Sequence, residues 1–209
     1  MKKTIDSLRY SLYVIFHPFD GFWCAKREEK GDMKAATIIL AVVVVTYILL
    51  RQLTGFIFNY NEPKDLNILS ETLSIIIPFL LWCAANWGIT TLMDGEGTLK
   101  DIYIASAYSL VPLIIINIPL LLLSNIIVLE EGNLYYVISS FAVIWTGFLL
   151  FTGTMTIHQY TIGKTVLTII IAIIGMAGII FLLLLFFALI QQLINFVYIF
   201  YKEFTLRLL

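Results

Sequence analysis

The stretch MDGEGTLKD, Met93 to Asp101, gathers the side chains of this sequence best suited to metal or acid–base chemistry. Its three carboxylates, on Asp94, Glu96 and Asp101, are of the type that binds hard cations or exchanges protons. A calcium loop of the EF-hand type needs ligands that alternate over about twelve residues, and this stretch ends too soon. A lipid-headgroup transferase would need further carboxylates on the following helix, and residues 102–112 contain none.

A helix hairpin explains most of these residues without chemistry. Gly95 can end one helix in a left-handed conformation. Thr98 and Asp101 have the spacing of a capping box at the start of the next helix, where Asp101 also meets the positive end of the helix dipole. The stretch is therefore predicted to be a hairpin, although capping gives no role to Asp94 or Glu96.

A second polar stretch, HQYTIGKT, ends in the Gly-Lys-Thr of a phosphate-binding loop. That loop also requires a glycine five residues before Gly163, and His158 stands at this position. Nucleotide binding is therefore not expected. His158 is interpreted as a hydrogen-bonded packing residue, with titration or partner binding as the alternative.

The remaining reactive side chains form no catalytic pattern. Cys24 precedes the first long apolar run and Cys83 lies inside the second, so the two thiols are not expected to pair. Neither cysteine has a recognisable pair of catalytic histidine and acid nearby in sequence, and no nucleophile-elbow serine is visible. The sequence predicts that the protein is not an enzyme and that it holds no catalytic residue, metal or cofactor.

The elements that position these polar stretches are apolar helices. Hydrophobic residues make up 60% of the chain and charged residues 13%, against about a quarter charged in soluble domains. Charge-free runs that can cross ~30 Å of hydrocarbon must be helices, because lipid cannot bond the backbone of open strands. The prediction is an all-α integral membrane bundle with five transmembrane helices near residues 35–57, 71–93, 102–127, 134–158 and 166–198.

The amino terminus predicts an amphipathic helix that lies in the membrane interface. Apolar residues from Ile5 to Phe16 recur at helical spacing, and Pro18 stops the helix before the aromatic residues that follow. The last apolar run is too long for one upright crossing, so its end is expected to continue into the interface. The predicted organisation is an interfacial segment, a five-helix domain and a short tail, at residues 1–34, 35–201 and 202–209.

The distribution of Lys and Arg predicts the orientation. Nine of them fall in the segments on the amino-terminal side of the predicted spans and four on the opposite side. Basic residues favour the cytoplasm. We therefore expect a multi-pass protein of the cell membrane with a cytoplasmic amino terminus and an external carboxyl terminus.

At the centres of the spans the polar residues are neutral, and Arg51 lies towards the outer end of the first span. Asn86 lies in the second span and Asn117 in the third, where Pro112 and Pro119 each remove a helix donor. A kinked but packed third helix is the simpler interpretation. A broken helix that lines a substrate path is the alternative.

Three blocks give the chain a family resemblance. They are HPFDGFW, NWGITTLMDGEGTLKDIYIASAYSLVPLIIINIP and GTMTIHQYTIGKT, in this order and between spans of this length. The chain resembles the Yip1-domain family of small five-span membrane proteins. The resemblance implies a helical bundle with a cytosolic amino terminus.

The resemblance also bears on partners. Eukaryotic relatives are associated with vesicle traffic and small GTPases, but their Tyr-Gly-Pro signature and longer amino-terminal region are missing here, which favours a prokaryotic-type member. The resulting hypothesis is a non-enzymatic accessory or scaffold protein for another integral membrane protein, such as an ABC-type exporter, or for membrane organisation and trafficking. The alternative is a small permease or lipid-translocating protein. The expected partners are the bilayer and that second protein. No nucleic acid is expected, and homo-oligomerisation is left open.

The predicted topology brings three polar stretches to one cytoplasmic face, which we expect to dock the partner. The residues predicted for this docking face are Phe22, Trp23, Asp94, Glu96, His158, Gln159 and Tyr160. Asn86 and Asn117 are the predicted polar residues inside the membrane.

Overall fold

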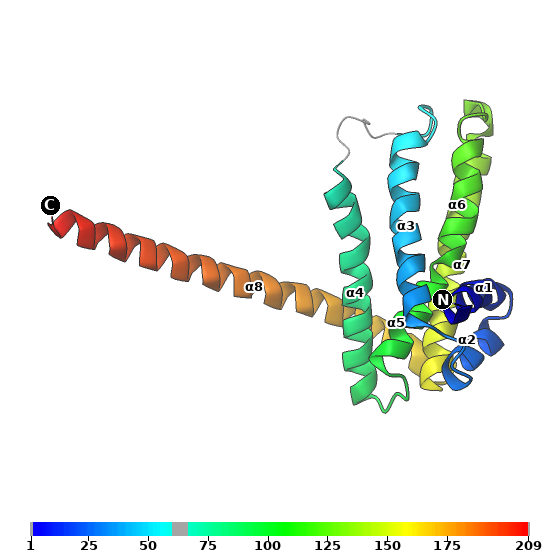
Figure 1. Ribbon diagram of the computed structural model, residues 1–209, viewed down its shortest axis with the longest axis horizontal. Helices are drawn as coiled ribbons and strands as arrows, with labels where there is room; N and C mark the ends of the chain where they lie inside the picture. The colour runs from blue at the N-terminus through cyan, green and yellow to red at the C-terminus, as the bar shows by residue number, and fades with distance from the viewer. Residues whose placement is uncertain (1, 60–66, 209) are drawn as a thin grey trace.

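The computed structural model describes residues 2–59 and 67–208, and within these residues the chain is helical, without strands (Figure 1). The helices are α1 (Lys2–Phe16), α2 (Pro18–Arg27), α3 (Met33–Leu53), α4 (Ile68–Leu92), α5 (Leu99–Ser109), α6 (Val111–Leu123), α7 (Gly132–His158) and α8 (Ile162–Leu208), with a short 3₁₀ helix, η2 (Leu129–Glu131). Five stretches are long and apolar enough to cross a membrane: α3, α4, α5 with α6, α7, and most of α8. The predicted all-α class and the five apolar spans are confirmed.

The bundle is built from α3, α4, α6 and α7, which run roughly parallel or antiparallel, with α5 across one end (Figure 1). Tyr108 of α5 and Leu149 of α7 are fully buried at its centre, and Val43 of α3 packs in the same cluster. Many large apolar side chains point outward instead, as expected for helices surrounded by lipid.

The amino-terminal segment forms two helices rather than one. α1 ends at Phe16 and Pro18 starts α2, so the predicted stop is confirmed and the second helix is new. Proline suits a first helical position because its missing N–H would have no partner there. Ser7 fastens α1 to the bundle: its hydroxyl donates to the carbonyl of Lys30 at 2.8 Å and lies in hydrogen-bond contact with the hydroxyl of Tyr108.

The third span is interrupted, which corrects the prediction of one kinked helix. α5 ends at Ser109, and α6 begins at Val111 with Pro112 in its first turn. Pro119 lies inside α6 without ending it. The break therefore falls at Leu110, just before the proline whose ring would clash with a continuing helix.

α8 differs from the other spans in its packing. Its 47 residues extend about 70 Å, and Figure 1 shows it leaving the bundle crosswise to α3 and α4. Thr165, Thr168 and Ala172 are buried near its start, whereas residues 181–201 are all exposed. A helix that is apolar on every side is stable in lipid rather than on an aqueous surface. The expected interfacial position of its end stays a prediction.

The hairpin between α4 and α5 has the predicted capping box and a different left-handed residue. The Asp101 N–H donates to Thr98 Oγ1 at 3.3 Å, and the Thr98 N–H donates to Asp101 Oδ2 at 3.0 Å. Asp94, with φ 56°, takes the left-handed conformation that was predicted for Gly95. Aspartate tolerates this conformation better than most side chains do.

Replacing the capping residue should destabilise the protein. Thr98→Val keeps the shape of the side chain and removes the oxygen that accepts from Asp101, so we expect a loss of about 0.5–2 kcal/mol in the free energy of unfolding. Thermal unfolding in detergent measures it. Thr91→Val is the matched control, because that exposed hydroxyl bonds only Trp87 of its own helix. Equal melting temperatures for both variants would contradict a structural role for the cap.

Candidate functional site

Three segments far apart in the sequence meet at one end of the bundle, which we call the polar end. They are the second half of α2, the α4–α5 loop (residues 93–98) and the α7–α8 turn (residues 159–161). Glu96 joins all three, because its Oε2 accepts from Arg27 Nη2 at 2.9 Å and from Gln159 Nε2 at 2.6 Å. Helix capping gave no role to Glu96, and these contacts show that its carboxylate links the three segments.

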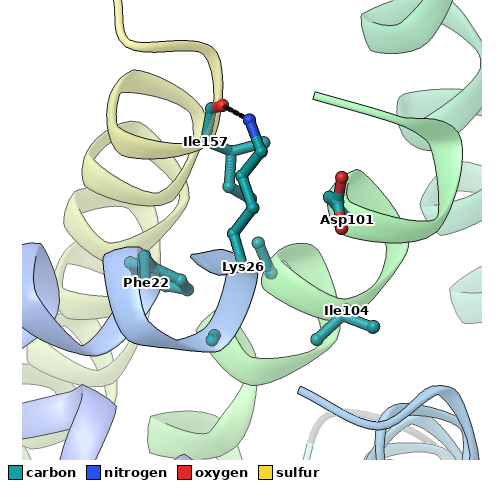
Figure 2. A pocket seen from close by; sticks show the side chains of 7 residues that line it. Phe22, Lys26, Asp101, Ile104 and Ile157 are labelled. Carbon is teal, nitrogen blue, oxygen red and sulfur yellow. Dashed lines mark hydrogen bonds between the residues drawn. The ribbon is translucent and has the colours of Figure 1, made fainter. Parts of the chain in front are cut away.

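Lys26 makes the second connection. Its ammonium donates to the carbonyl of Ile157 at 2.7 Å and to the carbonyl of Glu96 at 3.1 Å. Figure 2 shows the side chain reaching from α2 to the end of α7, with Phe22 one turn earlier and Asp101 across a small gap. A cation suits this position because it meets the negative end of the α7 dipole and a carbonyl that α7 itself leaves unpaired.

His158 lies inside the polar end with 2% of its surface exposed. Its Nδ1 accepts a hydrogen bond from the Gly97 N–H at 3.2 Å, and its ring stacks on Tyr160 with 5.3 Å between centroids. Because Nδ1 acts as acceptor, the imidazole is neutral and carries its hydrogen on Nε2. The interpretation of His158 as a hydrogen-bonded packing residue agrees with this geometry.

Tyr160 closes the end of α4. Its hydroxyl donates to the carbonyls of Met93 at 3.0 Å and Thr90 at 3.3 Å, which lie at the carboxyl end of that helix. Burial raises the pKa of Tyr160, and the negative charge of Asp94 raises it further. The phenol therefore keeps the hydrogen that it donates. Gln159 precedes it in the left-handed conformation, with φ 54°.

The two glycines of the α4–α5 loop are required by close packing. A Cβ on Gly95 would lie 2.5 Å from His158 Nδ1 and 2.6 Å from the Tyr160 hydroxyl. A Cβ on Gly97 would lie 2.5 Å from Ile157. These positions therefore hold glycine for lack of space and not for a positive φ, which explains the misplaced left-handed prediction.

The structure divides the predicted docking residues into two groups. Trp23, Asp94, Glu96 and Gln159 are exposed. Phe22, His158 and Tyr160 are buried, which corrects the expectation that they form the surface. Phe22 is fully buried because α2 packs on α7 at Gly153, where a Cβ would lie 3.2 Å from the phenyl ring. These three side chains are packed beneath the exposed residues of the polar end.

Lys26 and Arg27 were missed as residues of the site. In the sequence analysis they counted only as basic charges that predict the orientation, since α2 was not predicted. The available signal was helical spacing: Phe22 and Lys26 are four residues apart, and so are Trp23 and Arg27, which places each pair on one face. The guanidinium of Arg27 lies over the Trp23 ring, 5.2 Å from its centroid.

The intramembrane asparagines lie apart from this surface. Asn86 and Asn117 are both buried, and Asn86 borders a cavity of about 10 Å³ next to the α5–α6 break. This space holds about one water molecule. Among the described residues no group of three His, Cys, Asp or Glu side chains could hold a metal ion.

Five stretches that can cross a bilayer, with polar side chains gathered at one end and apolar side chains facing outward, define a multi-pass α-helical membrane protein. The family model of the Yip1 domain matches residues 12–186, so the chain belongs to the Yip1 domain family and the resemblance seen in the sequence is confirmed. No curated protein and no solved structure matches the chain.

Adding one methyl group tests the packing of the loop. In Gly95→Ala the new Cβ forces His158 and Tyr160 away from their hydrogen-bond partners, and we expect a loss of about 1–3 kcal/mol in unfolding free energy. Gly88→Ala is the matched control, because no atom lies within 4 Å of a Cβ there. We expect the control to melt at or above the wild-type temperature. A Gly95→Ala variant as stable as the control would show that the loop packs less closely than described.

Proposed function

We propose that this protein is a non-enzymatic accessory or scaffold protein whose polar end docks another integral membrane protein, for example a transporter of the ABC type. The observation that carries the proposal is an exposed stripe on α2, formed by Phe19, Trp23 and Arg27. Phe19 and Trp23 are 53% and 45% exposed although α2 is packed on the bundle by its opposite face. Trp and Arg are the residue types most enriched among side chains that dominate binding energy.

The contacts beneath this stripe support docking because they make it rigid. Lys26 and Glu96 fix α2 to the loop and to α7, so Trp23 and Arg27 are held on a surface with little freedom to lose. A surface ordered before binding loses less entropy when a partner arrives. Asp94 and Gln159 lie exposed on the neighbouring segments and offer polar contacts at its edge.

The permease hypothesis has less support. A groove of about 440 Å³ does lie beside the break at Leu110, but most of the side chains that line it are apolar, as expected of a surface that faces lipid. Pro112 and Asn117 are buried by packing rather than set along a channel. An enzymatic role has less support too, because His158 Nδ1 already accepts from the Gly97 N–H and the ring stacks on Tyr160.

The proposal includes a cytoplasmic polar end in the cell membrane, with the amino terminus inside and the carboxyl terminus outside. Single cysteines test it in a chain that also carries Cys24→Ser and Cys83→Ala. Lys100→Cys lies in the first turn of α5 and Asn133→Cys in the first turn of α7, at exposed positions near opposite ends of the bundle. An impermeant thiol reagent should label only Asn133→Cys in intact cells, and Lys100→Cys after the membrane is opened. Labelling of Lys100→Cys in intact cells would show that the orientation is opposite to the proposed one.

Docking is tested by purification from native membranes in mild detergent. Trp23→Ala should reduce recovery of the partner at least fivefold and leave the melting temperature near wild type, because this face of the indole is not packed in the core. Phe56→Ala is the matched aromatic control, since Phe56 is 89% exposed beyond the opposite end of α3. Unchanged recovery with Trp23→Ala, or equal loss with Phe56→Ala, would contradict docking at the α2 stripe and leave Trp23 as an anchor in the membrane interface.

A further inference from the structure

A small polar cavity lies inside the bundle, between α4, α5 and α7 and below the polar end. Its volume is about 10 Å³. Polar side chains from all three helices border it: Asn86, Ser106, Ser109, Thr154 and His158. Cavities left by imperfect packing are usually lined by apolar groups, and those lined by polar groups hold ordered water.

Two buried polar atoms at this cavity have no partner. They are Asn86 Oδ1, on a side chain that is 1% exposed, and His158 Nε2, on a side chain that is 2% exposed. An unpaired polar atom away from water costs about 1–3 kcal/mol. Both atoms therefore need a partner that the described residues do not supply.

The two atoms have opposite hydrogen-bonding character. His158 Nδ1 accepts from the Gly97 N–H, so Nε2 carries the hydrogen and is a donor. Asn86 Oδ1 is an acceptor. A metal cation would be repelled by the Nε2 hydrogen and an anion by the amide oxygen. Water both accepts and donates, and the volume fits one molecule.

A second acceptor is available for the other hydrogen of that water. The hydroxyl of Ser109 already donates to the Ala105 carbonyl at 2.8 Å, and that of Thr154 to the Leu150 carbonyl at 2.8 Å. Each hydroxyl oxygen keeps lone pairs that can accept. A water molecule here would thus have about three partners, the usual number for buried water.

We propose that this cavity binds one water molecule, which accepts from His158 Nε2 and donates to Asn86 Oδ1. The link runs from Asn86 in α4 through the water and the imidazole to the backbone of Gly97. The Gly97 N–H sets the tautomer of His158 by donating to Nδ1, and the water gives the Nε2 hydrogen its partner, so the ring is held on both sides. The inference depends on the cavity alone and holds whether or not the polar end docks a partner.

Nuclear magnetic resonance of the full chain in lipid nanodiscs tests this directly. The chain has two histidines, and the exposed His17 serves as the internal reference for a solvent-facing ring. With ¹⁵N-histidine we expect one neutral tautomer at His158, protonated on Nε2, and a cross-peak between its Nε2 hydrogen and a water molecule. A tautomer protonated on Nδ1, or an Nε2 hydrogen without contact to water, would overturn the proposal.

A matched pair of variants separates the water link from general loosening of the core. Asn86→Leu keeps the approximate size of the side chain and removes the acceptor, so the water cross-peak should disappear while the Gly97 N–H keeps Nδ1 unprotonated. Asn117→Leu makes the same change at a buried asparagine that does not border the cavity. A water cross-peak that persists in Asn86→Leu, or one that is also lost in Asn117→Leu, would overturn the link. If Asn86→Leu does not fold, the wild-type measurement decides.

Discussion

The carboxyl ends of two helices meet at the polar end, and each leaves backbone carbonyls that its own helix cannot pair. At the end of α7 the carbonyl of Ile157 is bonded by Lys26, which arrives from α2. At the end of α4 the carbonyl of Met93 is bonded by Tyr160, which follows α7, whereas that of Thr90 accepts from the Met93 and Gly95 N–H groups as well as from Tyr160. Because Ile157 and Tyr160 are buried, these carbonyls lie largely out of water, and leaving them unpaired would be costly. The two side chains that pair them also fix the positions of α2 and the α7–α8 turn.

The space between these two helix ends then determines the loop. His158 and Tyr160 stack between α4 and α7, and the chain passes close to them at Gly95 and Gly97. A side chain at either glycine would displace the rings. The acidic side chains of the loop therefore lie before Gly95, at Asp94, and between the two glycines, at Glu96. Asp94 and Glu96 consequently point outward, and Glu96 reaches Arg27 and Gln159. Exposure of the acidic side chains and burial of the aromatic ones have the same cause.

This arrangement separates the residues that could contact a partner from those that hold the surface in place. Exposed ion pairs such as Glu96 with Arg27 contribute little stability alone, about 0–1 kcal/mol. The packing of the buried Phe22 against Gly153 and the partly buried bond from Lys26 to Ile157 carry the rigidity. The exposed groups can therefore vary without loosening the surface, whereas the buried ones are constrained by the bundle.

The sequence by itself determined the features that depend on neighbouring residues. Apolar runs of membrane length fixed the five spans, Pro18 ended α1, and the spacing of Thr98 and Asp101 gave the capping box, because each signal acts within a turn or along one helix. The family blocks could also be read directly. The break at Leu110 was only partly visible, since Pro112 permits a kink or a stop and the packing of α5 on α7 selects between them.

Only the tertiary structure decided which polar residues are paired and which are buried. Lys26 and Ile157 are 131 residues apart, and no local pattern indicates that they touch. Glu96 and His158 looked alike in the sequence as polar residues beside a span, yet one is exposed and the other buried. Their difference follows from the packing of α2, α4 and α7, because side-chain burial depends on the relative positions of whole helices while helix formation depends on residues a few positions apart.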